Sequence, residues 1–282
     1  MRPPFRLLAI TPPVAPVPAD LVSRWLGAGA LDIALLLREP GTPAGQLLAP
    51  HGRLAAIRAA CVARGIPVLL SIDASELGLQ VPPDIAGLHL RGDPELALLE
   101  RARRIHPVPS HSQPSAHPVP SDTVPSDSLP PARPVPSHSL TDPHTVPSDS
   151  LPRAPPVPSH SPGPWLGRSC HGAPRPGHAL VDYTLFAPVF APTTAQPGRP
   201  PGSKIPAGLA ALRAWTAAPG AVIYALGGIS PANAAACLAA GAHGLAGIGV
   251  FFGEPGQVAQ DVAALREIVA ASDRHVEPVS PR

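Results

Sequence analysis

Short apolar runs alternate along the chain with longer segments of helical periodicity. The run Leu31–Leu37 is almost continuously hydrophobic, as expected for a parallel strand covered on both faces. In Pro231–Ala240 the small and apolar residues suit a helix instead, and Ser230 stands at its N-cap position with proline directly after it. This alternation predicts repeated βα units and a parallel sheet.

Eight such units are predicted. The expected strands are Arg6–Thr11, Leu31–Leu37, Ile66–Ile72, Ile85–Leu90, Trp165–Cys170, Leu180–Ala187, Ala221–Leu226 and Ala242–Ile248. The expected helices are Ala19–Ala28, Gln46–Arg64, Ser75–Leu79, Pro94–Ile105, Gly172–His178, Ala207–Ala217, Pro231–Ala240 and Pro255–Ala271. Eight units favour a closed ring over an open sheet, so the predicted fold class is α/β, a (β/α)8 TIM barrel.

One segment interrupts this pattern. Residues 106–164 contain 18 prolines, 12 serines and no aromatic residue, and cannot bury enough apolar surface to offset the entropy of an ordered chain. Pro-Val-Pro-Ser recurs four times there, and a repeat expansion explains the six irregularly spaced histidines better than metal binding does. We therefore predict a disordered insert at 106–164 between barrel halves at 1–105 and 165–272, followed by a flexible tail at 273–282.

Composition excludes several classes of function. The formal charge is only +2 and no basic stripe is present, so nucleic acid is not an expected partner. No window reaches the roughly 18 apolar residues of a membrane helix, and the N-terminal apolar run is too short for a signal peptide. Three cysteines without metal-ligand spacing suggest reduced thiols, which favours a cytoplasmic protein. The expected partners are small phosphorylated substrates, and a homo-oligomer stays possible.

Paired glycines carry the clearest chemical signal. Gly227-Gly228 follows the seventh predicted strand, and Gly247-Ile248-Gly249 follows the eighth. Barrels of this class commonly bind phosphate at these two loops, because bare backbone N–H groups can approach an anion closely. The alternative is that the glycines serve only to make tight turns.

Several short motifs, taken in order, resemble the thiamine-phosphate synthase and TenI-like family. The resemblance spans the chain apart from the insert and the tail, and its best segment is ALGGISPANAAACLAAGAHGLAGIGVFF at 225–252. The other segments that carry it are Leu37–Glu39, Asp73, Gly87–Leu90, Gly167–His171, Asp182-Tyr183 and Ala187–Phe190. No single motif decides the assignment, whereas their order does.

The resemblance implies a reaction that joins an aminopyrimidine methyl diphosphate to a thiazole phosphate and releases pyrophosphate. Cationic side chains and Mg²⁺ would stabilise the leaving group. It implies catalytic roles for Arg38, Ser169 and His171 and Mg²⁺ ligation by Asp73 and Asp93. It implies substrate and phosphate binding by Thr193, Thr194, Gly227, Gly228, Ile248 and Gly249.

The sequence departs from the family on the side of the pocket that would hold pyrophosphate. Family side chains are replaced by Leu36, Pro40, Ile72 and Ala74. The lysine that ends the family's loop after strand six falls at positions 195–196, which are Ala and Gln, and Lys204 reaches inward only if that loop folds back. The half that would hold the thiazole phosphate is intact.

Structural explanations stay open for the same residues. Arg38 and Asp73 could form an ion pair across the barrel mouth, His89 could pack inside the fourth strand, Ser169 could cap the next helix, and His171 could be a hydrogen-bonded rim residue. Three functions therefore remain. The first is a synthase that needs both halves of the pocket, and the second is a TenI-like thiazole tautomerase that needs His171 and no metal. The third is a phosphate-binding protein without turnover.

Overall fold

The structure is a computed structural model that describes residues 2–13, 17–18, 20–26, 32–107, 165–194 and 204–274. Nearly all of the predicted insert and the tail from 275 onward lie outside these residues, so their disorder stays a prediction. No helix in the described part is long and apolar enough to span a membrane.

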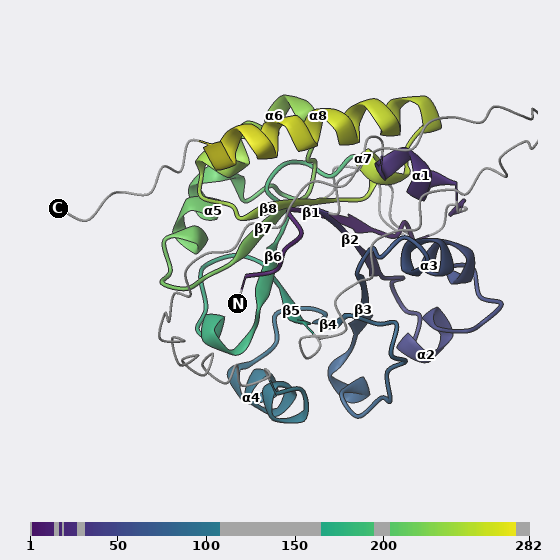
Figure 1. Cartoon of the computed structure of the whole chain (residues 1–282). Coiled ribbons are helices and arrows are strands. Elements are labelled where there is room, and N and C mark those ends of the chain that lie inside the picture. The colour runs from purple at the N-terminus through teal and green to yellow at the C-terminus, as the bar shows by residue number, and fades with distance from the viewer. Residues whose placement is uncertain are drawn as a thin grey trace, which may run out of the picture. The chain divides into compact units, whose positions relative to one another are not determined.

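The barrel is closed by eight parallel strands, as predicted (Figure 1). The strands are β1 (Leu7–Ile10), β2 (Ile33–Leu37), β3 (Val68–Ile72), β4 (Gly87–Leu90), β5 (Trp165–Cys170), β6 (Tyr183–Phe186), β7 (Ile223–Leu226) and β8 (Gly244–Gly247). Each pairs with the next, and β8 returns to β1 with Leu245 opposite Leu7. The eight-fold periodicity thus identified a (β/α)8 barrel correctly.

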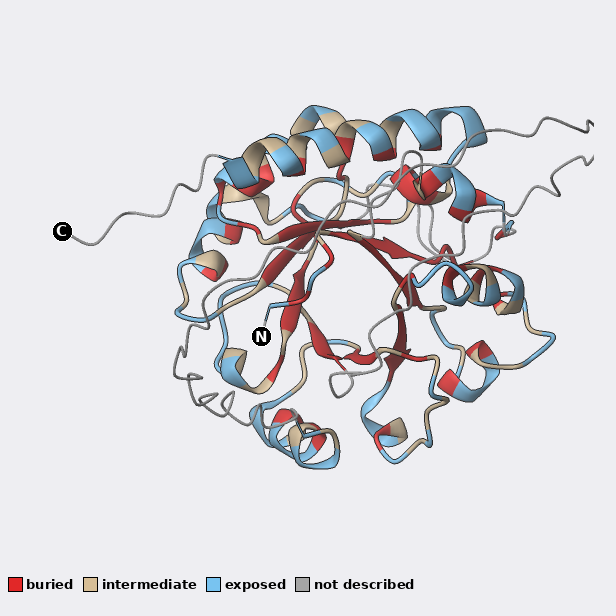
Figure 2. Ribbon diagram, in the orientation of Figure 1, coloured by how far each residue is buried: buried red, intermediate tan, exposed pale blue. Residues whose placement is uncertain are grey.

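Helices surround the ring of strands and turn their buried faces toward it (Figure 2). They are α1 (Leu21–Leu26), α2 (Ala44–Leu47), α3 (Ala55–Val62), α4 (Leu96–Ile105), α5 (Gly208–Thr216), α6 (Pro231–Ala239), α7 (Gly249–Phe252) and α8 (Pro255–Arg274). Two short 3₁₀ turns, η1 (Ala74–Glu76) and η2 (His178–Leu180), replace helices in the third and fifth units.

Three predicted helices differ from the observed elements. The segment Gln46–Arg64 forms two helices rather than one, because the chain turns between them and the Gly52 N–H donates to the Ala49 carbonyl. The helix predicted at Gly172–His178 is wrong, since both Gly172 and Gly177 have positive φ, which no α-helix accommodates. The helix predicted at Ser75–Leu79 is instead the 3₁₀ turn η1.

Aromatic side chains fill the barrel interior. Two glycines in the strands leave room for them. A Cβ at Gly167 would lie 2.1 Å from the Tyr183 ring, and one at Gly244 would lie 2.6 Å from the Tyr224 ring. Phe5 packs against both tyrosines. Since this packed interior leaves no channel through the barrel, a ligand site has to lie at one end of the strands.

Candidate functional site

A pocket at the carboxyl ends of the strands brings together nine of the eleven predicted site residues. They are Arg38, Ser169, His171, Thr193, Thr194, Gly227, Gly228, Ile248 and Gly249. The two predicted metal ligands, Asp73 and Asp93, are not among the residues that line it. The carboxyl-end location is the one that the barrel fold predicts for a site.

The turn after β7 can be built only with glycines. Gly227 has φ of 100° and Gly228 has φ of 60°, in the left-handed region. A Cβ at Gly227 would lie 2.6 Å from the Pro188 Cβ, and one at Gly228 would lie 2.5 Å from the Ala191 carbonyl oxygen. This close packing bears out the structural explanation for the two glycines. It does not exclude a binding role, because the turn also lines the pocket.

Residues of the β7 and β8 turns line one pocket together with two threonines. They are Gly228, Gly249, Thr193 and Thr194. A Cβ added to Gly249 would lie 3.5 Å from the Thr194 Oγ1 and 3.9 Å from the Thr193 Oγ1. Among the described residues, no backbone carbonyl accepts the N–H of Gly228 or Gly249. Backbone N–H groups and hydroxyls are the kind of donor that binds phosphate, so this part of the pocket is the candidate phosphate site.

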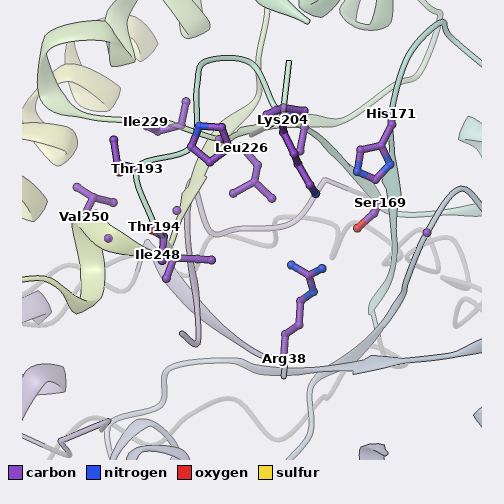
Figure 3. A pocket seen from close by; sticks show the side chains of 18 residues that line it. Arg38, Ser169, His171, Thr193, Thr194, Lys204, Leu226, Ile229, Ile248 and Val250 are labelled. Atoms are coloured by element: carbon purple, nitrogen blue, oxygen red, sulfur yellow. The ribbon is translucent and has the colours of Figure 1, made fainter. Parts of the chain in front are cut away.

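Two cationic side chains also line this pocket. In Figure 3 the Arg38 guanidinium and the Lys204 ammonium point toward each other, with Ser169 and His171 to one side of them. The backbone of Arg38 is clamped by Thr11, whose hydroxyl accepts from the Arg38 N–H at 2.8 Å and donates to the Arg38 carbonyl at 2.6 Å. Burial, and then the neighbouring charge of Arg91, lower the pKa of Arg38.

Lys204 was expected to reach inward only if its loop folded back, and its side chain does line the pocket. The route of the chain through 195–203 lies outside the described residues. The lysine that lines the pocket thus stands eight or nine positions after the position expected from the family, 195–196.

Ser169 is held by a buried histidine. Its Oγ lies 2.8 Å from Nε2 of His89, and Nδ1 of His89 lies 3.2 Å from the Tyr183 hydroxyl. Burial, with the charges of Arg38 and Arg91, lowers the pKa of His89 to about 3. His89 is therefore neutral near pH 7 and orients the Ser169 hydroxyl rather than exchanging protons. The predicted packing role for His89 agrees with its complete burial.

His171 combines access with an orienting carboxylate. Its backbone N–H donates to Oδ1 of Asp93 at 2.8 Å, and its ring Nδ1 lies 3.4 Å from Oδ2 of the same residue. The side chain is 43% exposed and lines the pocket. A histidine held in this way can act as a general acid or base.

The described side chains do not fit the predicted Mg²⁺ site. Asp73 Oδ1 lies 3.3 Å from the Arg91 Nε. Asp73 therefore forms its ion pair with Arg91 and not with Arg38, the partner expected in the structural explanation. Asp93 is engaged by His171. Within the described ranges no group of three or more His, Cys, Asp or Glu side chains is placed to hold a metal. Mg²⁺ stays a prediction, and we derive no chemical step through it.

Arg91 is the residue near the site that sequence reasoning missed. It follows β4 directly, as Arg38 follows β2, so its position at the end of a buried strand was a usable signal. The family motif at Gly87–Leu90 ends one residue before it.

Comparisons with known proteins point to the family that the sequence motifs resemble. A family described as thiamine monophosphate synthase matches residues 145–251. The thiamine-phosphate synthase of Methanoculleus marisnigri is 41% identical over 92 residues, which cover 33% of this chain and 41% of that protein. The match thus spans about two fifths of the relative's length.

Solved structures support the fold. Thiamine phosphate pyrophosphorylase from Pyrococcus furiosus superposes with a TM-score of 0.52 and 18% identity, covering 95% of this chain and 96% of that one. A structure described as native KDPGal superposes with a TM-score of 0.51 and 13% identity, covering 97% of this chain and 98% of that one. At such identities these likenesses establish the barrel alone. The resemblance seen in the sequence motifs is confirmed by the family and the curated relative.

Proposed function

We propose that this chain, which is similar to thiamine-phosphate synthases, is a transferase that condenses an aminopyrimidine methyl diphosphate with a thiazole phosphate. The observation that carries the proposal is the meeting of two kinds of group in one pocket. Glycine turns that suit a phosphate line part of the pocket, and the Arg38 and Lys204 side chains point into it toward each other. A synthase needs both kinds, because it holds one phosphate while it releases a diphosphate.

The thiazole phosphate would bind at the β7 and β8 turns. The N–H groups of Gly228 and Gly249 and the hydroxyls of Thr193 and Thr194 are suitable donors. Rigid donors of this kind need little reorganisation when the anion arrives. The thiazole ring would then extend toward the middle of the pocket.

The diphosphate would lie against Arg38 and Lys204. In the reaction the bond between the pyrimidine methylene carbon and the diphosphate oxygen breaks, and its electron pair leaves with pyrophosphate. The thiazole nitrogen then uses its lone pair to form the new carbon–nitrogen bond. Negative charge grows on the leaving oxygens, so two positive charges close to them would lower the activation free energy of this step.

Ser169 would position the pyrimidine. Because neutral His89 fixes its hydroxyl, Ser169 can present one defined donor or acceptor to a heterocycle nitrogen. Ser169 would thus contact substrate, and His89 would be a positioning residue that acts through it.

A TenI-like thiazole tautomerase is the second candidate, favoured by the His171–Asp93 pair at the pocket. A tautomerase moves a proton on its thiazole substrate and needs a phosphate cradle and a histidine, but no site for a diphosphate. The cationic pair of Arg38 and Lys204 has no role in that reaction, which is why we place it second.

Two substitutions separate the candidates. A synthase loses turnover with Arg38→Ala and keeps most of it with His171→Ala, whereas a tautomerase shows the reverse pattern. Both variants are assayed for thiamine phosphate by fluorescence after oxidation and for thiazole isomerisation by NMR. Arg24→Ala, which removes an exposed arginine from α1, is the matched control. If the wild-type protein is inactive in both assays but binds thiazole phosphate, the third candidate, a non-catalytic binding protein, is supported.

A further inference from the structure

The guanidinium of Arg91 is surrounded by oxygen atoms at the rim between β3 and β4. Its Nε lies 3.3 Å from the Asp73 Oδ1. Its Nη2 lies 3.2 Å from the Thr42 carbonyl, 3.4 Å from the Ser71 carbonyl and 3.4 Å from the Glu76 Oε2. The Arg91 side chain is only 13% exposed.

One of the two carboxylates of this group is fixed by the backbone. Glu76 Oε1 accepts the Ala44 N–H at 2.6 Å, and its Oε2 accepts the Asp73 N–H at 2.8 Å. Asp73 and Glu76 also form the capping box of η1. The Glu76 carboxylate is therefore held in place, whereas the Asp73 side chain is 56% exposed.

Such a set of oxygens normally suits a hard divalent cation. Two carboxylates and two carbonyls are the ligands that Ca²⁺ and Mg²⁺ prefer in proteins. Here a guanidinium, which is positively charged at every accessible pH, takes that place. A metal ion at Asp73 would meet strong repulsion from Arg91, because the two charges would be separated by only a few ångströms.

We infer that Arg91 serves as the built-in cation of this rim, and that the pocket binds its anionic substrate without a divalent metal. The inference rests on the proposed function, since it describes the charged half of the same pocket. Arg91 offsets one of the two negative charges of Asp73 and Glu76. The positive charge of Arg38 and Lys204 then meets a weaker opposing field from these two carboxylates.

The closeness of Arg91 to the pocket supports this electrostatic role. Its charge contributes to the lowered pKa values of both Arg38 and His89. These residues lie at the end of β2 and inside β4, so the charge of Arg91 acts on the neighbouring part of the barrel rim.

The first test uses Mn²⁺ alone with the full chain and measures binding by electron paramagnetic resonance. We expect the wild-type protein to bind no Mn²⁺ below millimolar concentration. We expect Arg91→Ala to gain one site per chain, which a second substitution, Asp73→Asn, removes. A tight wild-type site abolished by Asp73→Asn would overturn the inference, and so would the failure of a folded Arg91 variant to gain a site. Arg91→Gln, which keeps hydrogen-bonding groups but not the charge, replaces Arg91→Ala if the alanine variant does not fold.

The second test measures the binding of inorganic pyrophosphate by calorimetry, with EDTA or with Mg²⁺. We expect wild-type affinities that agree within about twofold, and an Arg91→Ala affinity in EDTA that is weaker by about tenfold and recovers with Mg²⁺. Pyrophosphate that binds the wild-type protein only with Mg²⁺, or not at all, would overturn the inference.

Arg58→Ala is the matched control for both tests. Arg58 is a similarly buried guanidinium, 17% exposed, that pairs with Asp84 and a backbone carbonyl away from the pocket. It should leave metal and pyrophosphate binding unchanged. Because the Mn²⁺ test uses no substrate, it decides the role of Arg91 even if the proposed synthase activity is absent.

Discussion

The two halves of the pocket are built from different materials. The half at β7 and β8 uses backbone N–H groups, and its glycines are fixed by steric contacts with Pro188 and Ala191. The half facing it uses long side chains, Arg38 and Lys204, which reach in from β2 and from the chain preceding α5. A backbone site depends on a few obligatory glycines, whereas a charge can be supplied from several positions.

This difference explains why the two halves looked so unequal in the sequence. The region that matches the known family, 145–251, contains both glycine turns, and Arg38 and Asp73 lie outside it. The charged half appeared eroded because its expected positions are changed. In the structure Lys204 lines the pocket although the expected lysine position is changed, and Arg91 places a cation beside Asp73.

Removing the charge of Lys204 would test the charged half most severely. We expect Lys204→Ala to lower kcat/KM for thiamine phosphate formation by about 100-fold, because one of two charges facing the leaving group is lost. Lys204→Arg should recover much of the activity. Steady-state kinetics of the two variants are the measurement, and equal activity of wild type and Lys204→Ala would show that only Arg38 serves this half.

Filling the glycine turn would test the backbone half. Gly228→Ala places a Cβ 2.5 Å from a carbonyl oxygen at a positive φ, so we expect a loss of about 1–3 kcal/mol in the free energy of unfolding and weaker binding of thiazole phosphate. The matched control is Gly41→Ala, where φ is 78° but no atom lies within 4 Å.

Denaturant unfolding and calorimetry of the two glycine variants separate backbone strain from steric contact. If Gly41→Ala and Gly228→Ala lower the free energy of unfolding by the same amount, the close approach to Ala191 does not contribute to the cost. The contrast between a sterically fixed half and an adaptable half would then be lost.

Lowering the pH would test the role of His89, which holds the Ser169 hydroxyl beneath the pocket. The folded pKa of His89 is about 3, below the usual value of 6.5, so protons bind the unfolded chain more readily. The free energy of unfolding is therefore unaffected by His89 above about pH 6.5. As the pH falls from 6.5 toward 3, protonation of this histidine in the unfolded chain lowers the free energy of unfolding by at most about 1.4 kcal/mol per pH unit.

His243, whose pKa is lowered to about 4, adds a slope of the same sign. We therefore expect His89→Gln to flatten the loss of unfolding free energy between pH 7 and pH 5 without removing it. Urea unfolding at several pH values is the measurement, and identical slopes in variant and wild type would contradict the assigned neutral state of His89.

The smallest effect is expected from the predicted insert, which belongs to neither half. Replacing residues 106–164 with a short glycine–serine linker should change stability by about 1 kcal/mol, because each doubling of a flexible loop costs only about 0.6 kcal/mol. A melting temperature lowered by ten degrees or more would show that this segment contributes to the barrel.

The sequence predicted the barrel and the glycine turns for physical reasons, whereas the family resemblance supplied most of the other residues that line the pocket. Buried parallel strands leave continuous apolar runs, so Trp165–Cys170 was predicted with its exact bounds. Helix ends were harder, because the turn at Gly52 and the positive φ of Gly172 depend on backbone geometry that composition does not reveal. The same limit applied to the charges, since long side chains such as Lys204 act far from their own Cα atoms.

The most direct test of the account is a crystal structure of the full chain with thiazole phosphate and inorganic pyrophosphate. We expect the thiazole phosphate group to lie within hydrogen-bonding distance of the Gly228 and Gly249 N–H groups. Pyrophosphate should lie against Arg38 and Lys204. A phosphate bound elsewhere, or a complex in which both anions avoid these two side chains, would contradict it.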